Sequence, residues 1–194
     1  MRYSTLHTFY IFTTLGLFLS LSSCRETPIP KPKGYLALEF PTPKYELWQQ
    51  NTPYTFEQNT NTTVENANTK ISKHWYTLHY PKFKGAIHLS YYPIKNNLRK
   101  LTQDAQNLTQ QHVVKADEIS YHPYVDSLQN IHAMLYEVKG NAASNIQFYV
   151  TDKKKHFITG AAYIKNRPKY DSLYPAIKYL EKDTKHLIET LRWQ

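Results

Sequence analysis

The chain of 194 residues contains a single cysteine, Cys24, so it cannot form an intrachain disulfide bond. Its stability must come from the packing of an apolar core. Glycine is also scarce, with five residues, and none of them forms the glycine-rich pattern that cradles a phosphate group. These absences exclude a disulfide-stapled scaffold and a nucleotide-binding loop of the P-loop type.

Short catalytic and metal-binding motifs are missing as well. The sequence has no Gly-x-Ser-x-Gly, no His-Glu-x-x-His and no Cys-x-x-Cys. His74, His79 and His88 are close in sequence, but strand alternation places His74 and His79 on opposite faces. We therefore expect no catalytic residue, no metal site and no cofactor, and we do not expect an enzyme.

The longest apolar run, Phe9 to Leu21, is too short to span a membrane as a helix, which takes about 20 residues. The run follows the positive charge of Arg2 and precedes small residues, as in a secretory signal peptide. Leu21-Ser22-Ser23-Cys24 fits a bacterial lipobox, although a free thiol beside an ordinary cleavage site would have the same sequence. We expect a lipoprotein signal over residues 1–23 and lipidation of Cys24, typically with palmitate. Two or more acyl chains anchor a protein stably, whereas one holds it marginally.

The remaining chain divides into a tether and a domain. Residues 24–34 contain three prolines in the stretch RETPIPKPKG, which favours an extended chain. Residues 35–194 are expected to form a single domain. The formal net charge of +9 favours anionic neighbours such as lipid headgroups or an anionic envelope polymer. The positive charges are scattered except at Lys153-Lys154-Lys155, and export excludes nucleic acid as a partner.

Aromatic and β-branched runs around short turns predict antiparallel strands. Three hairpins are expected, pairing residues 75–80 with 86–92, 119–124 with 131–138, and 145–151 with 156–164. Further strands are expected over 35–40 and 54–57, with a polar loop in the remainder of 49–73.

Two segments have the apolar periodicity of amphipathic helices. The first, residues 95–111, places Leu98, Leu101, Ala105 and Leu108 on one face. The second, residues 172–191, places Ile177, Leu180, Thr184, Leu187, Ile188 and Leu191 on one face, with Asp171 or Ser172 as N-cap. This order predicts an α+β fold, in which an internal and a C-terminal helix pack on an antiparallel sheet. Such a fold resembles the Mog1/PsbP-like sandwich.

The stretch from Gly140 to Asp152 concentrates uncharged hydrogen-bonding groups. Its candidate contact patch consists of Asn141, Ser144, Asn145 and Gln147. An alternative interpretation is a turn between strands in which these side chains bond the local backbone.

Several segments, in order along the chain, resemble the gliding motility lipoprotein family GldD. They are LSSC, PIPKPKGYLALEFPTPKY, YPKFKGAIHLSYYPI, VKADEISY, GNAASNIQFYVTDKKKHFITGAAYI and PKYDSLYPAIKYLEKDTKHLIETLRW. The resemblance implies a lipoprotein of the Bacteroidetes envelope that is required for gliding and linked to type IX secretion. It assigns a role to Cys24 as the lipidation site and to no catalytic residue.

The sequence therefore predicts a non-catalytic accessory factor that contacts other gliding and secretion proteins of the envelope. Surface-exported Bacteroidetes lipoproteins often carry an acidic cluster after the cysteine, whereas Arg25-Glu26 offers one acid. We thus expect the periplasmic face of the outer membrane. A binding module for an anionic envelope polymer is the main alternative, and a cell-envelope enzyme is a weaker one.

Overall fold

The computed structural model describes residues 40–67, 73–111, 116–165 and 169–194. Contacts divide the chain into two units, residues 1–32 and residues 33–194, and every described residue belongs to the second. The expected signal peptide, Cys24 and the tether lie outside the described residues. Of the strand expected over 35–40, only Phe40 is described, and it is not in a strand.

Within the described residues, the larger sheet has seven antiparallel strands in the spatial order β3-β4-β5-β9-β8-β7-β6. Its strands are β3 (Thr63–Asn66), β4 (Tyr76–Tyr80), β5 (Gly85–Pro93), β6 (Ala116–Asp126), β7 (Ile131–Gly140), β8 (Ile146–Thr151) and β9 (His156–Ile164). Side chains alternate between the faces, so that Ile87 and Leu89 are buried while His88 between them is exposed. The three predicted hairpins, β4–β5, β6–β7 and β8–β9, are confirmed.

The β5–β9 pair joins the two halves of this sheet. Its register runs from Gly85 opposite Ile164 to Pro93 opposite His156. Gly160 lies at the middle of β9, where the Phe148 ring of β8 packs directly over it. A Cβ atom at position 160 would lie 2.1 Å from Cζ of Phe148, so only glycine fits without a shift of the ring.

The smaller sheet consists of β1 (Tyr45–Trp48), β2 (Tyr54–Asn59) and β10 (Arg192–Trp193), in the order β1-β2-β10. The predicted strand at 54–57 is confirmed as β2. No sequence signal predicts β1, β3 or β10, because these strands are short and are defined by their pairing partners. β10 is fixed by Arg192 opposite Thr55 and Trp193 opposite Tyr54.

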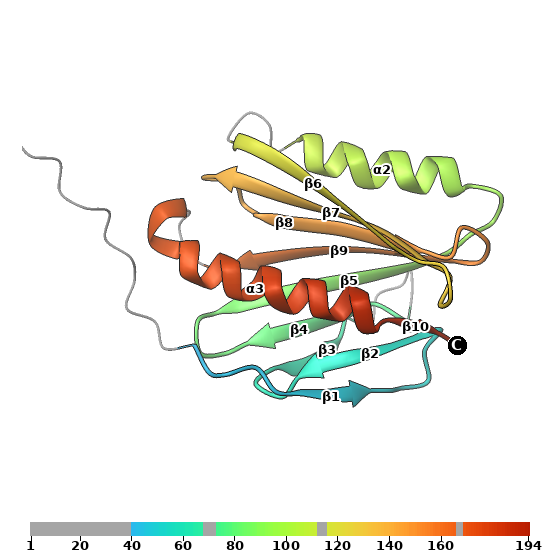
Figure 1. The fold of residues 1–194 in the computed structure, drawn as a ribbon, viewed down its shortest axis with the longest axis horizontal. Coiled ribbons are helices and arrows are strands. Elements are labelled where there is room, and N and C mark those ends of the chain that lie inside the picture. The colour runs from blue at the N-terminus through green and yellow to red at the C-terminus, as the bar shows by residue number, and fades with distance from the viewer. Residues whose placement is uncertain (1–39, 68–72, 112–115, 166–168) are drawn as a thin grey trace, which may run out of the picture. The chain divides into compact units, whose positions relative to one another are not determined.

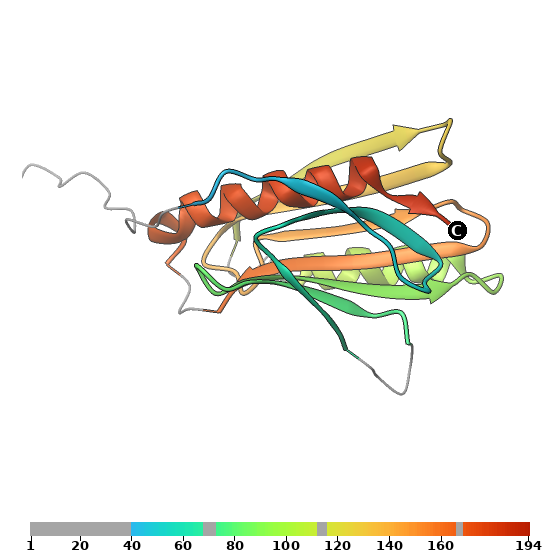
Figure 2. The same ribbon diagram turned by 90° about the horizontal axis from the view of Figure 1, so that it is seen from below.

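The two helices of the described residues, α2 (Leu98–Gln110) and α3 (Tyr170–Thr190), pack on opposite faces of the larger sheet. Figures 1 and 2 show α3 lying along the face that also carries the smaller sheet, with α2 beyond the larger sheet. The apolar face predicted for the C-terminal helix is confirmed as the core-facing side of α3. Its buried members are Ile177, Leu180, Thr184, Leu187, Ile188 and, just past the helix, Leu191.

The face predicted for the first helix is wrong in part. α2 buries Ala105 and Thr109, whereas Leu108 is 52% exposed. The hydroxyl of Thr109 donates to Oε1 of Gln147 in β8 at 3.2 Å, whereas Leu108 lies at the open rim of the contact between α2 and the sheet. Apolarity alone therefore misplaces the packed side of α2, because its contact with the sheet is partly polar.

The predicted N-cap of α3 is also wrong. The helix begins at Tyr170 after Lys169, which makes no capping hydrogen bond with its side chain. Instead, Oδ1 of Asn141 in the β7–β8 loop accepts the backbone N–H of Tyr170 at 2.9 Å. Asp171 lies in the first turn, where a negative charge is favourable. The cap thus comes from a distant part of the chain.

The architecture is an α+β sandwich, as the sequence predicts. Its core lies between the larger sheet, the smaller sheet and α3, and its fully buried side chains include Tyr54, Phe56, Ile87, Ile158 and Leu180. In the part of the chain that the structure describes, no helix has the length and apolarity needed to cross a membrane.

Candidate functional site between α3 and its flanking strands

α3 carries two buried carboxylates, Glu181 and Asp183, which are 5% and 4% exposed. They are buried because strands lie along both sides of the helix: β7 contacts one flank and β1 the other. Removing an unpaired charge from water costs several kcal/mol, so each buried carboxylate needs partners. Those partners define the candidate site.

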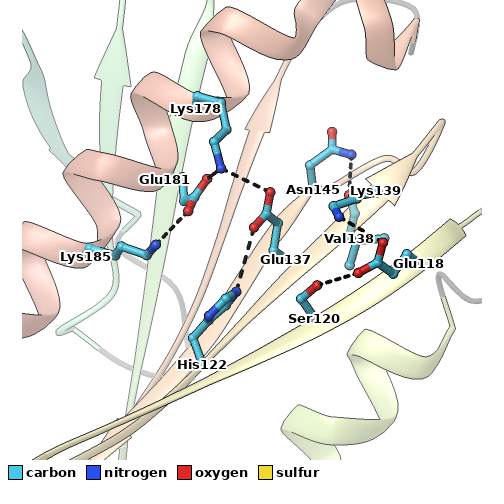
Figure 3. Close-up of polar contacts among 10 residues, drawn as sticks. All are labelled: Glu118, Ser120, His122, Glu137, Val138, Lys139, Asn145, Lys178, Glu181 and Lys185. Atoms are coloured by element: carbon cyan, nitrogen blue, oxygen red, sulfur yellow. Dashed lines mark hydrogen bonds and ion pairs between the residues drawn. The ribbon is translucent and has the colours of Figure 1, made fainter.

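Glu181 belongs to a charged cluster that we term the α3–β7 network, made of His122, Glu137, Lys178, Glu181 and Lys185 (Figure 3). The ammonium group of Lys178 lies between the carboxylates of Glu181 and Glu137, with an Nζ to Oε1 distance of 3.3 Å to Glu137. Lys185 contacts the other oxygen of Glu181 at 2.7 Å. Nε2 of His122 lies 3.7 Å from Glu137.

For Glu181 and Lys178, ion pairing outweighs the effect of burial on the pKa. Burial of Glu181 would raise the pKa of its carboxyl group, but the hydrogen bonds and charges of Lys178 and Lys185 hold that pKa below its usual value. Burial likewise opposes the charge of Lys178, yet Glu181 and Glu137 raise the pKa of its ammonium group. Glu181 and Lys178 are therefore both charged at neutral pH. The ion pair of Lys178 with Glu137 connects α3 to β7.

The opposite flank of α3 is held by neutral donors. The hydroxyl of Tyr45 donates to one oxygen of Asp183 at 2.7 Å, and the amide of Asn59 donates to the other at 2.7 Å. Burial, followed by the Asp183 carboxylate, raises the pKa values of Tyr45 and Tyr80. The tyrosines therefore stay protonated and act as donors that stabilise the buried charge.

His186 extends this flank toward solvent. Its ring stacks on Tyr45 with centroids 3.6 Å apart, and Nε2 contacts the carboxylate of Glu57 at 2.8 Å. The contact joins the C-terminal half of α3 to β2. Both sides of the helix are thus tied to strands by polar contacts, in addition to its apolar underside.

A cleft of about 250 Å³ opens beside the network, and we term it the α3 cleft. It lies between the second half of α3 and the β6–β7 hairpin, with His122 and Tyr124 on one wall and Lys185 and Glu189 on the other. Leu135 and other apolar side chains line its remaining surface. Such a mixed surface can receive a side chain of a protein partner.

The residues of the predicted contact patch make hydrogen bonds within the chain. The amide of Asn145 donates to the carbonyls of Val138 and Gly140 at 2.8 and 3.0 Å, as Figure 3 shows for Val138. Ser144 donates to the carbonyls of Ile146 and Ala162.

The two other patch residues form hydrogen bonds with the helices. Asn141 caps α3, and Gln147 accepts from Thr109 of α2. The four residues thus lie in and beside one loop but do not converge on a common surface group. Their role in contacts with other proteins stays a prediction.

The histidines of β4 and β5 have separate partners. His79 contacts Glu65 at 3.1 Å, whereas His88 bonds to Thr77 at 2.7 Å and to the hydroxyl of Tyr163 at 2.9 Å. Among the described residues, no three His, Cys, Asp or Glu side chains gather closely enough to hold a metal ion.

The sequence gives no direct signal for the α3–β7 network or for the Asp183 contacts. Glu181 and Asp183 stand among lysines on a helix and look like solvated surface charges. Their spacing of two residues does carry one usable hint, because it places them on different flanks of the helix. Both carboxylates can therefore be buried only if other elements lie along both flanks of α3.

The described domain is an α+β sandwich, and the class of protein, a lipoprotein, follows from a comparison with protein families. Residues 25–193 match the family described as gliding motility lipoprotein GldD. Because this match covers most of the chain, the chain belongs to that family, and the resemblance seen in the sequence is confirmed. Membership implies a lipid-anchored protein of the cell envelope with a role in gliding motility. A search of curated proteins found no match to the chain.

Proposed function

We propose that this lipoprotein is a non-catalytic accessory factor that supports assembly of the gliding and type IX secretion machinery through protein contacts. Its membership of the gliding motility lipoprotein family is the observation that carries the proposal. The anchor is the acylated Cys24, and the domain lies at the periplasmic face of the outer membrane. The single acid after that cysteine, Glu26, supports this face over the cell surface.

The buried carboxylates are bound to other side chains of the chain, which supports a non-catalytic role. A general acid or base must exchange a proton with a substrate within hydrogen-bonding reach. Glu137 and Glu181 instead contact lysines, and Asp183 accepts from Tyr45 and Asn59. These carboxylates stabilise the position of α3.

The α3 cleft is the surface that we assign to the partner. It combines an apolar lining with charged groups at its rim, and the α3–β7 network of ion pairs lies beside it. A preorganised surface loses little conformational entropy on binding. Tyr124 is the side chain best suited to report a contact there, because it lines the cleft and is half-buried.

The anchor is tested by Cys24→Ala, with Cys24→Ser as a second variant that also lacks the acylated thiol. We expect both to release the chain from the membrane fraction and to abolish spreading of colonies in a gliding host. Full motility with soluble protein would contradict the need for the anchor.

The contact surface is tested by site-specific photo-cross-linking in cells, followed by mass spectrometry. A photoreactive residue at Tyr124 is expected to capture a gliding or secretion protein, whereas one at exposed Lys100 of α2 is the matched control. Glu189→Lys at the cleft should lower both the cross-link and motility. If Glu189→Lys abolishes motility while the cross-link at Tyr124 and the abundance of the protein are unchanged, an enzymatic role would be favoured instead.

A second function, binding of an anionic envelope polymer, is favoured by one observation. The three consecutive lysines at 153–155 form an exposed turn between β8 and β9. These lysines lie at one end of the larger sheet, and Lys154 and Lys155 are beside Arg192 and Trp193.

A further inference from the structure

One end of the larger sheet is hollowed and positively charged. The turn after β6, the turn after β8 and the residues after α3 surround a hollow of about 430 Å³. Lys154, Lys155 and Arg192 line it with cationic groups, and Trp193 and His156 line it with rings. Figure 1 shows these turns and β10 together at the end where the chain's C-terminus lies. We term this region the basic end.

The acids of the two turns, Asp126 and Asp152, form no ion pair with these cations among the described residues, although Asp152 also lines the hollow. Oδ1 of Asp152 accepts the backbone N–H groups of Lys154, Lys155 and His156, each at 2.8 Å. Although partial burial opposes it, these bonds hold the pKa of Asp152 below its usual value. Asp126 similarly accepts the backbone N–H of Leu128 at 3.0 Å. Both carboxylates are directed into their own turns.

The lysine side chains of the β8–β9 turn remain exposed to solvent. The ion pairs of lysines recorded among the described residues are those of Lys139, Lys178 and Lys185, none of which belongs to this turn. Lys153, at the tip of the turn, has a φ of 61°, a conformation that normally favours glycine or asparagine. The turn therefore presents three ammonium groups on a backbone that is fixed by Asp152.

A flat aromatic surface adjoins the cations. The ring of Trp193 stacks on His156 with centroids 5.1 Å apart and an interplanar angle of 13°. Its Nε1 donates to the carbonyl of Asn130 at 3.3 Å, which ties it to the turn after β6. Burial lowers the pKa of His156, so this ring is neutral at pH 7. Cations beside a fixed ring suit a ligand that carries both negative charge and a ring with an apolar face.

The basic end lies far from the start of the described chain. Phe40, the described residue nearest to Cys24 in sequence, packs on Phe83 at the Gly85 end of β5. The basic end lies at the other end of this strand, where Pro93 is opposite His156. At about 3.3 Å per residue, the nine-residue strand separates the two ends by roughly 30 Å.

We propose that the basic end binds a carboxylate-bearing glycan of the cell envelope. Lys154, Lys155 and Arg192 pair with its carboxylates, and a sugar ring packs against Trp193. The proposal rests on the envelope location given above, but it does not rest on the assembly role.

The test measures co-sedimentation of the full-length lipidated protein, kept in detergent, with insoluble peptidoglycan sacculi as the probe. Lys154→Glu combined with Lys155→Glu reverses two charges at the basic end. Lys82→Glu combined with Lys84→Glu makes the same change of net charge in the exposed β4–β5 turn at the other end. Circular dichroism verifies that both variants are folded, and the milder Lys154→Gln with Lys155→Gln gives a graded version.

We expect the basic-end variant to bind sacculi at least tenfold more weakly, the control variant to bind like the native chain, and binding to weaken as salt is added. An equal loss in both charge-reversed variants would show a non-specific effect of net charge and would overturn the site. Binding to phosphatidylglycerol vesicles that is lost in the basic-end variant, without binding to sacculi, would overturn the glycan in favour of a lipid surface. Motility is scored separately, so failure of the glycan proposal leaves the assembly role standing.

Discussion

The two helices of this domain are attached to the same sheet in different ways. α3 buries nine residues over its 21 positions and is fastened on both flanks by polar contacts. α2 buries only Ala105 and Thr109 and leaves Leu108 half-exposed. The comparison shows that amphipathic periodicity does not reveal how firmly a helix is held. The flanking strands around α3, which α2 lacks among the described residues, make the difference.

The comparison assigns the two helices different parts in stability. α3 closes the core between the two sheets, so its loss would expose both. α2 covers part of the far face and contacts β8 and β9. We therefore expect local opening of α2 at a lower free energy than global unfolding, whereas α3 should open only when the whole domain unfolds.

The largest effect is expected from a core truncation in α3. Leu180 is 1% exposed, and Leu180→Ala should lower the free energy of unfolding by about 2–5 kcal/mol through lost burial and a cavity. The matched truncation in α2, Leu108→Ala, should change it by less than about 0.5 kcal/mol. Urea denaturation of both variants measures the contrast, and equal losses would show that α2 is packed as firmly as α3.

The next effect concerns the charge between the two buried glutamates. Lys178→Ala leaves Glu137 and Glu181 without their shared cation and should cost about 2 kcal/mol. This value is below that of a fully buried pair because the Lys178 side chain is 41% exposed and Lys185 still contacts Glu181. Lys100→Ala on the exposed side of α2 is the control for denaturation, with an expected change within about 0.5 kcal/mol.

A smaller loss is expected at the start of α3. Asn141→Ala removes the side chain that caps Tyr170 and should lower the free energy of unfolding by about 1 kcal/mol. Asn141→Asp keeps an acceptor at the same place and should recover most of the loss. If Asn107→Ala on exposed α2 costs as much, the effect is not one of capping.

The smallest effect is a change in pH dependence. The folded-state pKa of Glu181 is lowered from a reference value of 4.5. Its contribution is therefore present above that reference value and is lost as the pH falls through the lower folded-state value. Glu181→Gln should flatten the loss of stability between neutral and acidic pH, as measured by denaturation at several pH values. A variant with an unchanged slope would show that Glu181 is not the titrating group.

Local patterns predict the hairpins because each pairs strands that are close in the chain. Alternation in β5, with buried Ile87 and Leu89 around exposed His88, is readable without any distant information. The short turns then fix the partner. β1, β3 and β10 could not be predicted in this way, because a four-residue segment such as β3, with three polar residues around Val64, becomes a strand only through pairing with β4.

The candidate site could not be predicted because its contacts are distant in sequence. Tyr45 and Asp183 are 138 residues apart, and Glu137 and Lys178 are 41 apart. Asn141 reaches Tyr170 across 29 residues, so a local search for an N-cap selects Asp171 or Ser172 instead. The sequence shows which residues are polar, whereas burial of those residues depends on the assembled sheet.

The pairing of β10 with β2 has a consequence for the order of folding. Arg192 and Trp193 lie opposite Thr55 and Tyr54, so the smaller sheet is complete only when residues near the end of the chain are present. Contacts between distant segments form slowly, since a long loop must close before they can stabilise anything. The smaller sheet is therefore expected to form late in folding, after the local hairpins of the larger sheet.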